Sequence, residues 1–169
     1  MALLTAFKSY VDECVDSDID LYEFVLNNYQ GFLKKRIAYA KGHELPKGWP
    51  AMSTYFCIRD TTDITKNADC EILGSIRIRH GHNDYIENVI GHIGYETKPS
   101  ARGLGVAKYM LAWVQDNMLT ENTIITCAAT NAASRKVIES SGAKYLSNFY
   151  CAEADCEVIR YQLGNSDLN

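Results

Sequence analysis

The sequence predicts a mixed α/β fold built around one sheet. Apolar residues alternate with period two in several short runs, as in half-buried strands. Between these runs apolar residues recur at the three- and four-residue spacing of helices. The chain has 169 residues, of which 47% are hydrophobic, so we expect one domain over residues 1–169 with a sizeable core.

The first half of the chain is expected to contain a helix followed by three strands. Residues 18–40 carry apolar side chains at helical spacing, and Asp18 or Asp20 can cap this helix. The three strands are expected at residues 53–59, 71–80 and 89–97. The polar residues 60–69 suit a hairpin loop between the first two strands. A further strand at residues 3–7 is an option before the helix.

The second half alternates helices and strands. Ala107, Leu111, Val114 and Met118 form one helical stripe, which predicts a helix over residues 105–118. A short apolar strand at 123–128 and a helix at 132–141, ended by Gly142, follow. The last two strands are expected at 143–150 and 157–163.

Composition narrows the classes of function. The formal net charge is −4, which argues against nucleic acid as a partner because such proteins usually present a basic face. None of the 6 cysteines forms a Cys-x-x-Cys pair, so a structural zinc site is not expected. No apolar run approaches the ~20 residues of a membrane span. We therefore expect a cytoplasmic protein, no membrane partner and no bound metal.

The most informative stretch is the turn Arg102-Gly103-Leu104-Gly105-Val106-Ala107 between a predicted strand and a predicted helix. A helix start has unpartnered backbone N–H groups and a positive dipole end, so it can bind a phosphate. The two glycines let a ligand approach the backbone, and Arg102 adds a charged donor. The turn predicts an anion site, although a glycine-rich turn that merely starts a helix also fits.

The residues in and around this turn resemble the GNAT superfamily of N-acetyltransferases. Arg102-x-x-Gly105-x-Ala107 matches the superfamily signature Gln/Arg-x-x-Gly-x-Gly/Ala. Gly91-His92-Ile93-Gly94-Tyr95 before the turn and residues 131–139 after it also carry the resemblance, which covers residues 71–163 well. It implies a mixed, mostly antiparallel sheet with a splayed central parallel pair, flanked by helices.

The resemblance implies acetyl-coenzyme A as co-substrate and a primary amine of a small molecule or protein as acceptor. In this superfamily the pyrophosphate binds the backbone of the turn, and the pantetheine arm lies between the splayed strands, here 89–97 and 123–127. The amine attacks the thioester directly in a ternary complex. The residues expected to bind the cofactor are Thr97, Arg102, Gly103, Leu104, Gly105, Val106, Ala107, Asn131 and Ser134.

The catalytic residues are less defined, because the sequence departs from the family pattern. Many members carry a tyrosine acid in the pattern Asn-x-x-Ala-x-x-x-Tyr, and Ile138 occupies that position. His92 and Glu96 should share one strand face, and either suits the base that deprotonates the amine. A core histidine and a solvated strand-end charge are their structural alternatives. Tyr95, Tyr145 or water are the candidates for the missing acid.

Several alternatives stay open. The missing tyrosine is compatible with a non-catalytic acyl-CoA-binding or sensing module, and the resemblance also admits an N-terminal protein acetyltransferase, another acyl donor and a homodimer. Arg79 and His80 either bind an acidic group of the acceptor or hydrogen-bond a loop carbonyl. His80, His82 and His92 have no accompanying acidic or cysteine ligand, which argues against a metal site.

Overall fold

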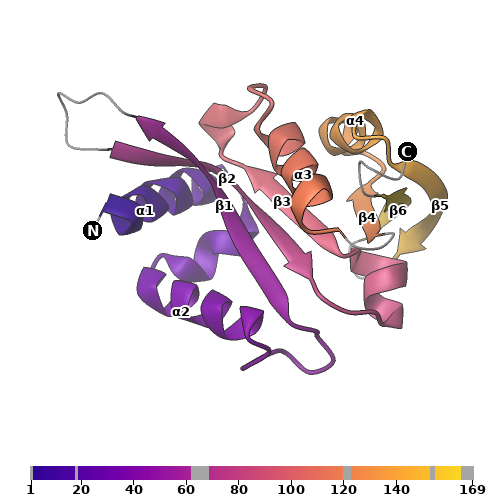
Figure 1. Ribbon diagram of the computed structural model, residues 1–169, viewed down its shortest axis with the longest axis horizontal. Helices are drawn as coiled ribbons and strands as arrows, with labels where there is room; N and C mark the ends of the chain where they lie inside the picture. The colour runs from indigo at the N-terminus through magenta and orange to yellow at the C-terminus, as the bar shows by residue number, and fades with distance from the viewer. Residues whose placement is uncertain (1, 18, 62–68, 120–122, 153–154, 165–169) are drawn as a thin grey trace. The chain divides into compact units, whose positions relative to one another are not determined.

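The computed structural model describes residues 2–17, 19–61, 69–119, 123–152 and 155–164 (Figure 1). Their contacts group into two compact units. The first unit comprises Met1–Ile76 and Tyr95–Val106, and the second comprises Arg77–Gly94 and Ala107–Asn169. The single domain expected from the sequence stays a prediction.

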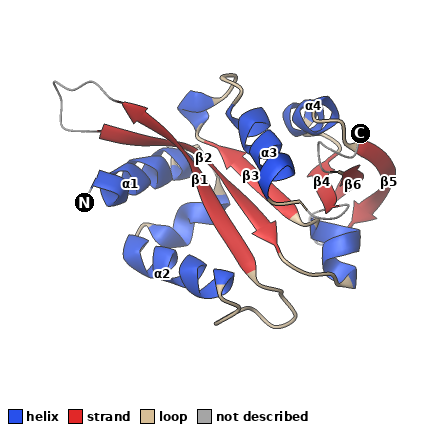
Figure 2. Ribbon diagram, viewed as in Figure 1, coloured by secondary structure: helices blue, strands red, loops and turns tan. Residues whose placement is uncertain are grey.

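Six strands form a mixed sheet in the order β1-β2-β3-β4-β6-β5, which confirms the predicted fold class (Figure 2). The strands are β1 (Met52–Thr61), β2 (Asp69–Arg79), β3 (Ile93–Thr97), β4 (Thr123–Ala128), β5 (Lys144–Cys151) and β6 (Cys156–Leu163). Strands β3 and β4 run parallel and are in register at Ile93 and Ile125. Strand β6 is antiparallel to both β4 and β5. The predicted hairpin loop at 60–69 falls largely outside the described residues.

The chain begins with a helix, α1 (Ala2–Val15), so the optional strand at residues 3–7 was wrong. Its buried residues Phe7, Tyr10, Val11 and Cys14 follow the i, i+3, i+4, i+7 spacing of one helix face. This spacing is visible in the sequence, but only over a window longer than the five residues considered for a strand.

The helix expected at residues 18–40 is divided in two. A 3₁₀ turn, η1 (Asp20–Val25), precedes the helix α2 (Tyr29–Ala40). The Asn28 side chain accepts a hydrogen bond from the Gly31 N–H at 2.8 Å. This cap satisfies a donor that a helix start leaves unpaired and so begins a new helix after η1.

The strand expected at residues 89–97 is shorter than predicted. Residues Ile86–Ile90 form a π-helical turn, η2, and β3 starts only at Ile93. The Asn83 side chain accepts a hydrogen bond from the Ile86 N–H at 2.9 Å. The local cap and the burial of Ile86 therefore outweigh the β-propensity of Val89 and Ile90.

The core of the first unit is aromatic. The ring of Phe7 stacks on Phe32 at 5.8 Å between centroids and meets the edge of Phe56 at 5.5 Å. Tyr10 and Tyr22 meet edge to face at 5.3 Å. These pairs join α1, η1, α2 and β1. The packing of the rings therefore also fixes the positions of the hydroxyl groups of Tyr10 and Tyr22.

The second unit is built on β4, β5 and β6 with the helices α3 (Val106–Asn117) and α4 (Ala132–Ser140). Both α4 and η2 pack against β4. The Gln115 side chain donates to the carbonyls of Ser141 and Gly164, at 3.1 and 3.2 Å, and so ties α3 to the segments after α4 and β6. Across the described parts of the chain, no helix is both long and apolar enough to span a membrane.

Gly91 has little room for a side chain. Its φ is +69°, and an added Cβ would lie 3.0 Å from the Ile124 carbonyl oxygen of β4. We predict that Gly91→Ala lowers the free energy of unfolding by about 2–4 kcal/mol, the sum of backbone strain and a steric clash. Urea unfolding measures this loss.

Gly42→Ala is the matched control, because Gly42 has a φ of +77° but no atom within 4 Å of an added Cβ. It should cost only the strain of the left-handed backbone, about 1–2 kcal/mol. Equal losses in the two variants would contradict the close approach of Gly91 to β4.

Candidate active site

The predicted anion-binding turn connects β3 to α3. A short 3₁₀ turn, η3 (Pro99–Ala101), follows β3, and α3 begins at Val106. Ala101 and Val106 are buried, whereas Arg102 and Leu104 between them are exposed. The turn is thus anchored at both ends and presents its middle to solvent.

The backbone of the turn offers donors to a ligand. Gly103 and Gly105 have φ values of +78° and +81°, and no atom lies within 4 Å of a Cβ added to either. For their N–H groups no acceptor is found among the described residues. The first N–H groups of α3, at Val106 and Ala107, are those that a helix leaves without intrahelical partners. Together these donors can bind an oxyanion such as a phosphate.

Asn131 and Ser134, the other predicted cofactor residues, lie at the start of α4 in the second unit. The Asn131 side-chain oxygen accepts a hydrogen bond from the Ser134 N–H at 3.0 Å. Asn131 is exposed, and it follows β4 by three residues. The cap gives α4 a defined N-terminus, whose dipole favours an anionic ligand.

Glu96, in β3, is partly buried and is held by three hydroxyl groups of the first unit. Tyr22 and Ser75 donate hydrogen bonds to its Oε1, and Tyr10 donates to the same oxygen at 3.4 Å. The Tyr22 hydroxyl also lies 3.2 Å from that of Tyr10 and 3.1 Å from Ser75 Oγ. Glu96 is therefore not a simple solvated strand-end charge, because the network fixes its carboxylate.

The two tyrosines remain protonated donors at neutral pH. Burial raises the pKa of Tyr10 and of Tyr22, and the negative charge of Glu96 raises both further. Sequence reasoning missed this network. Tyr10, Tyr22 and Ser75 come from α1, η1 and β2, and no local pattern relates three hydroxyls that are up to 65 positions apart.

His92 lies just before β3 and is 5% exposed. Its Nδ1 accepts a hydrogen bond from the Ile124 N–H at 3.1 Å, so in the neutral ring Nε2 carries the proton. This Nε2 is buried and has no hydrogen-bond partner among the described residues. In this tautomer His92 offers a donor rather than a base.

Ile138 cannot replace the tyrosine acid, because its side chain has no proton to donate. Its side chain is fully buried in the second unit, where it supports the core. Tyr145 is 59% exposed, and its hydroxyl donates to Asn148 at 3.3 Å. Tyr95, in the first unit and one residue before Glu96, is partly buried. The role of Tyr95 as acid stays a prediction.

An open groove of about 410 Å³ lies on the second unit. Its lining residues are Arg79, Tyr85, Val89, Ile90, Thr126, Cys127, Ala128, Cys151, Cys156 and Val158. Arg79 Nη1 donates to the Gly91 carbonyl at 3.1 Å, which supports the structural interpretation of this arginine. Burial raises the pKa of the Cys127 thiol, as expected for a packing residue rather than a nucleophile.

Among the described residues, no group of histidine, cysteine or acidic side chains is arranged to hold a metal ion.

Residues 25–144 match a family model described as an acetyltransferase (GNAT) domain. No curated protein matches the sequence significantly.

Solved structures of acetyltransferases share the fold. RimJ of Mycobacterium smegmatis, in complex with CoA-disulfide, is 15% identical, with a TM-score of 0.68 over 98% of this chain and 80% of that chain. RimL, a ribosomal L7/L12 alpha-N-protein acetyltransferase in complex with coenzyme A, is 16% identical, with a TM-score of 0.63 over 97% and 90%. The microcin C7 self-immunity acetyltransferase MccE, in complex with acetyl-CoA and AMP, is 14% identical, with a TM-score of 0.64 over 94% and 85%. These similarities establish the fold.

His92 should make stability depend on pH. Burial, reinforced by the nearby His82, lowers the pKa of His92. The unfolded chain then binds this proton more readily, so the stabilisation is complete above about pH 6.5 and decreases as the pH falls below it. We predict that the free energy of unfolding decreases from pH 7 to pH 5, and that His92→Gln has a shallower decrease.

Urea unfolding at the two pH values tests this prediction. His43→Gln, at an exposed histidine, is the control and should keep the wild-type difference. If His92→Gln loses as much free energy of unfolding between pH 7 and pH 5 as the wild type, the imidazole of His92 is not held neutral by burial.

Proposed function

Because this chain belongs to the GNAT family of acetyltransferases, we propose that it transfers an acetyl group from acetyl-CoA to a primary amine. The observation that carries the proposal is the exposed turn from Arg102 to Ala107, with two glycine N–H groups that have no described acceptor. An acetyltransferase of this family needs an anion site for its co-substrate, and the turn has the chemistry of such a site.

In this proposal the pyrophosphate of acetyl-CoA accepts hydrogen bonds from the N–H groups of Gly103, Gly105, Val106 and Ala107. Arg102 is exposed beside them and adds a charge-assisted contact. Leu104, 65% exposed, has a side chain available to cover the ligand. The residues proposed to bind other parts of the co-substrate are Thr97, at the end of β3, and Asn131 and Ser134, at the start of α4.

The reaction proposed is direct aminolysis of the thioester. The amine nitrogen attacks the acetyl carbon, the C–S bond breaks, and the products are an N-acetyl amine and CoA. Glu96 takes the proton that the nitrogen loses, and Tyr95 gives a proton to the leaving sulfur. Backbone N–H groups of the segment Tyr95–Thr97 stabilise the oxyanion that forms on the acetyl carbonyl.

We assign the base to Glu96 rather than to His92. The Glu96 carboxylate is an acceptor whose position is fixed by three hydroxyls. The His92 lone pair at Nδ1 is already used by the Ile124 N–H. The other nitrogen, Nε2, is a buried N–H donor, so His92 has no free lone pair with which to take a proton from the amine.

The acceptor is a primary amine of a small molecule or a protein, with acetyl-CoA as the donor. We place the protein in the cytoplasm, a proposal supported by its cysteines. All six are free thiols, in agreement with a reducing compartment.

Arg102→Glu tests the co-substrate site. A negative charge beside the pyrophosphate should weaken acetyl-CoA binding at least about tenfold, equivalent to ~1.4 kcal/mol. Isothermal titration calorimetry measures the affinity. Lys34→Glu, the same charge change at an exposed position of α2, is the control and should bind like the wild type. Unchanged affinity in Arg102→Glu would refute the site.

Glu96→Gln tests the chemistry. The amide cannot take a proton from the amine, so turnover should fall about a hundredfold or more while acetyl-CoA affinity stays within about twofold. Release of the free CoA thiol, followed with a panel of primary amines that includes peptide N-termini, measures turnover. Wild-type turnover in the variant would exclude Glu96 as the base. Binding of acetyl-CoA without turnover of any amine by the wild type would favour an acyl-CoA-binding module.

A further inference from the structure

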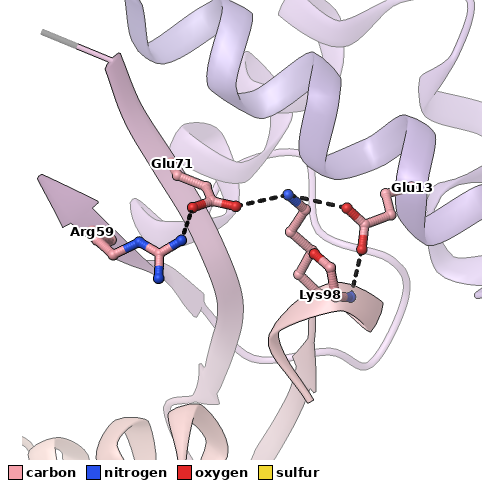
Figure 3. Close-up of polar contacts among 5 residues, drawn as sticks. Glu13, Arg59, Glu71 and Lys98 are labelled. Carbon is pink, nitrogen blue, oxygen red and sulfur yellow. Dashed lines mark hydrogen bonds and ion pairs between the residues drawn. The ribbon is translucent and has the colours of Figure 1, made fainter. Parts of the chain in front are cut away.

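A buried lysine lies immediately before the proposed pyrophosphate turn. Lys98 is 7% exposed, and its ammonium lies 3.0 Å from a carboxylate oxygen of Glu13 and 3.0 Å from one of Glu71. Figure 3 shows the ammonium between the two carboxylates, which come from α1 and β2. A charged group removed from water in this way needs such partners to remain charged.

Glu13 uses its two oxygens for different purposes. Oε2 forms the ion pair with Lys98, and Oε1 accepts a hydrogen bond from the Ser100 N–H at 2.5 Å. One carboxylate of α1 therefore holds both the side chain of Lys98 and the backbone of η3 (Figure 3). Two contacts to residues two positions apart fix the orientation of that segment as well as its location.

Backbone hydrogen bonds connect the segment held by Glu13 to the turn. The Ala101 N–H donates to the Lys98 carbonyl at 2.9 Å, and the Arg102 N–H donates to the Pro99 carbonyl at 3.2 Å. The Leu104 N–H then donates to the Ala101 carbonyl at 3.4 Å. Glu13 is thus connected to the turn by a continuous series of short-range hydrogen bonds.

The charges of the network support one another. Burial alone would raise the pKa of Glu13, but hydrogen bonds from Ser100 and Lys98 outweigh it and keep this pKa below its usual value. The hydrogen bond from Lys98 is the main cause that lowers the pKa of Glu71, and Arg59 adds to it. Burial would lower the pKa of Lys98, yet Glu71 and Glu13 raise it. All three groups are therefore ionised at neutral pH.

The ion network of Lys98 can act through its geometry as well as through stability. Apolar residues of similar size often stabilise a protein as well as a buried ion pair, because desolvation of the charges offsets their attraction. What charged hydrogen bonds add is a defined geometry. Here the geometry that they define is that of the segment from Lys98 to Ser100, directly before the turn.

We propose that Glu13 is a positioning residue for acetyl-CoA, which holds the turn from Arg102 to Ala107 in its ligand-binding conformation before the ligand arrives. The inference rests on the proposed function, because it assigns the pyrophosphate to this turn. A preformed site avoids the loss of conformational entropy on binding, and this gain raises affinity. Glu13 lies outside the matched residues 25–144, so the family match does not include it.

A comparison of two acetyl donors tests the proposal. Acetyl-CoA contains the pyrophosphate, whereas S-acetylpantetheine has the same thioester and arm but no pyrophosphate. In Glu13→Ala, we expect the KM for acetyl-CoA to rise about tenfold with kcat nearly unchanged. The kcat/KM for S-acetylpantetheine should change less than about twofold, because this donor makes no contact with the turn.

Two further variants complete the design. Glu13→Gln keeps the shape of the side chain but not its charge, and should give an intermediate rise in KM for acetyl-CoA; it also replaces Glu13→Ala if that variant does not fold. Glu23→Ala removes an exposed glutamate of η1 and should match the wild type with both donors.

The outcomes separate this inference from the proposed function. Equal losses with both donors would show that Glu13 acts only through general stability, and no loss with either donor would also overturn the inference. If wild-type protein binds neither CoA nor acetyl-CoA, the proposed function itself fails. If the wild type binds acetyl-CoA through Arg102 but Glu13→Ala is unaffected, only the positioning role is lost.

Discussion

The proposed co-substrate site depends on a backbone conformation. Gly103 and Gly105 are both in the left-handed region, and this places N–H groups without described acceptors at the exposed start of α3. Such donors cost free energy when they are left without water or a ligand, so the turn has to remain exposed while its flanks are fixed. Ala101 and Val106 are buried and hold the two ends of the turn by packing. The ion pair between Lys98 and Glu13 holds the segment before the turn.

Glu13 and Glu96, two carboxylates of the first unit, differ in the groups that donate hydrogen bonds to them. Glu13 accepts from an ammonium and a backbone N–H, and both of its partners are parts of the protein near the turn. Glu96 accepts hydrogen bonds from three hydroxyls, which are neutral donors. A carboxylate in an ion pair is suited to holding structure, whereas one that accepts hydrogen bonds from neutral hydroxyls has the chemistry of a base.

The second unit contains a comparable constraint at the approach to β3. Gly91 passes so close to β4 that a side chain would meet the Ile124 carbonyl, and the next residue, His92, accepts the Ile124 N–H. The close approach and the hydrogen bond determine which nitrogen of the imidazole carries the proton. The tautomer of His92, and with it the chemistry available to this residue, is therefore a consequence of local packing.

The sequence by itself determined the order of the strands along the chain, the α3 and α4 helices and the glycine-containing turn before α3. These features rest on periodicity and on glycines at fixed spacing, which act over short distances along the chain. The helix α1, the π-helical turn η2 and the division before α2 were not foreseen. In the last two, a local asparagine cap outweighs the apolar pattern of the neighbouring residues.

Only the tertiary structure decided what the polar side chains do. The partners of Glu96 come from α1, η1 and β2, and those of Lys98 from α1 and β2. Spacing along the chain carries no information about such encounters, because the aromatic packing of α1, η1 and α2 sets which side chains meet. The sequence could therefore indicate the turn that we propose binds an anion, and it offered Glu96 as one candidate for the base. The side chains that hold the turn and Glu96 in place became visible only in the folded chain.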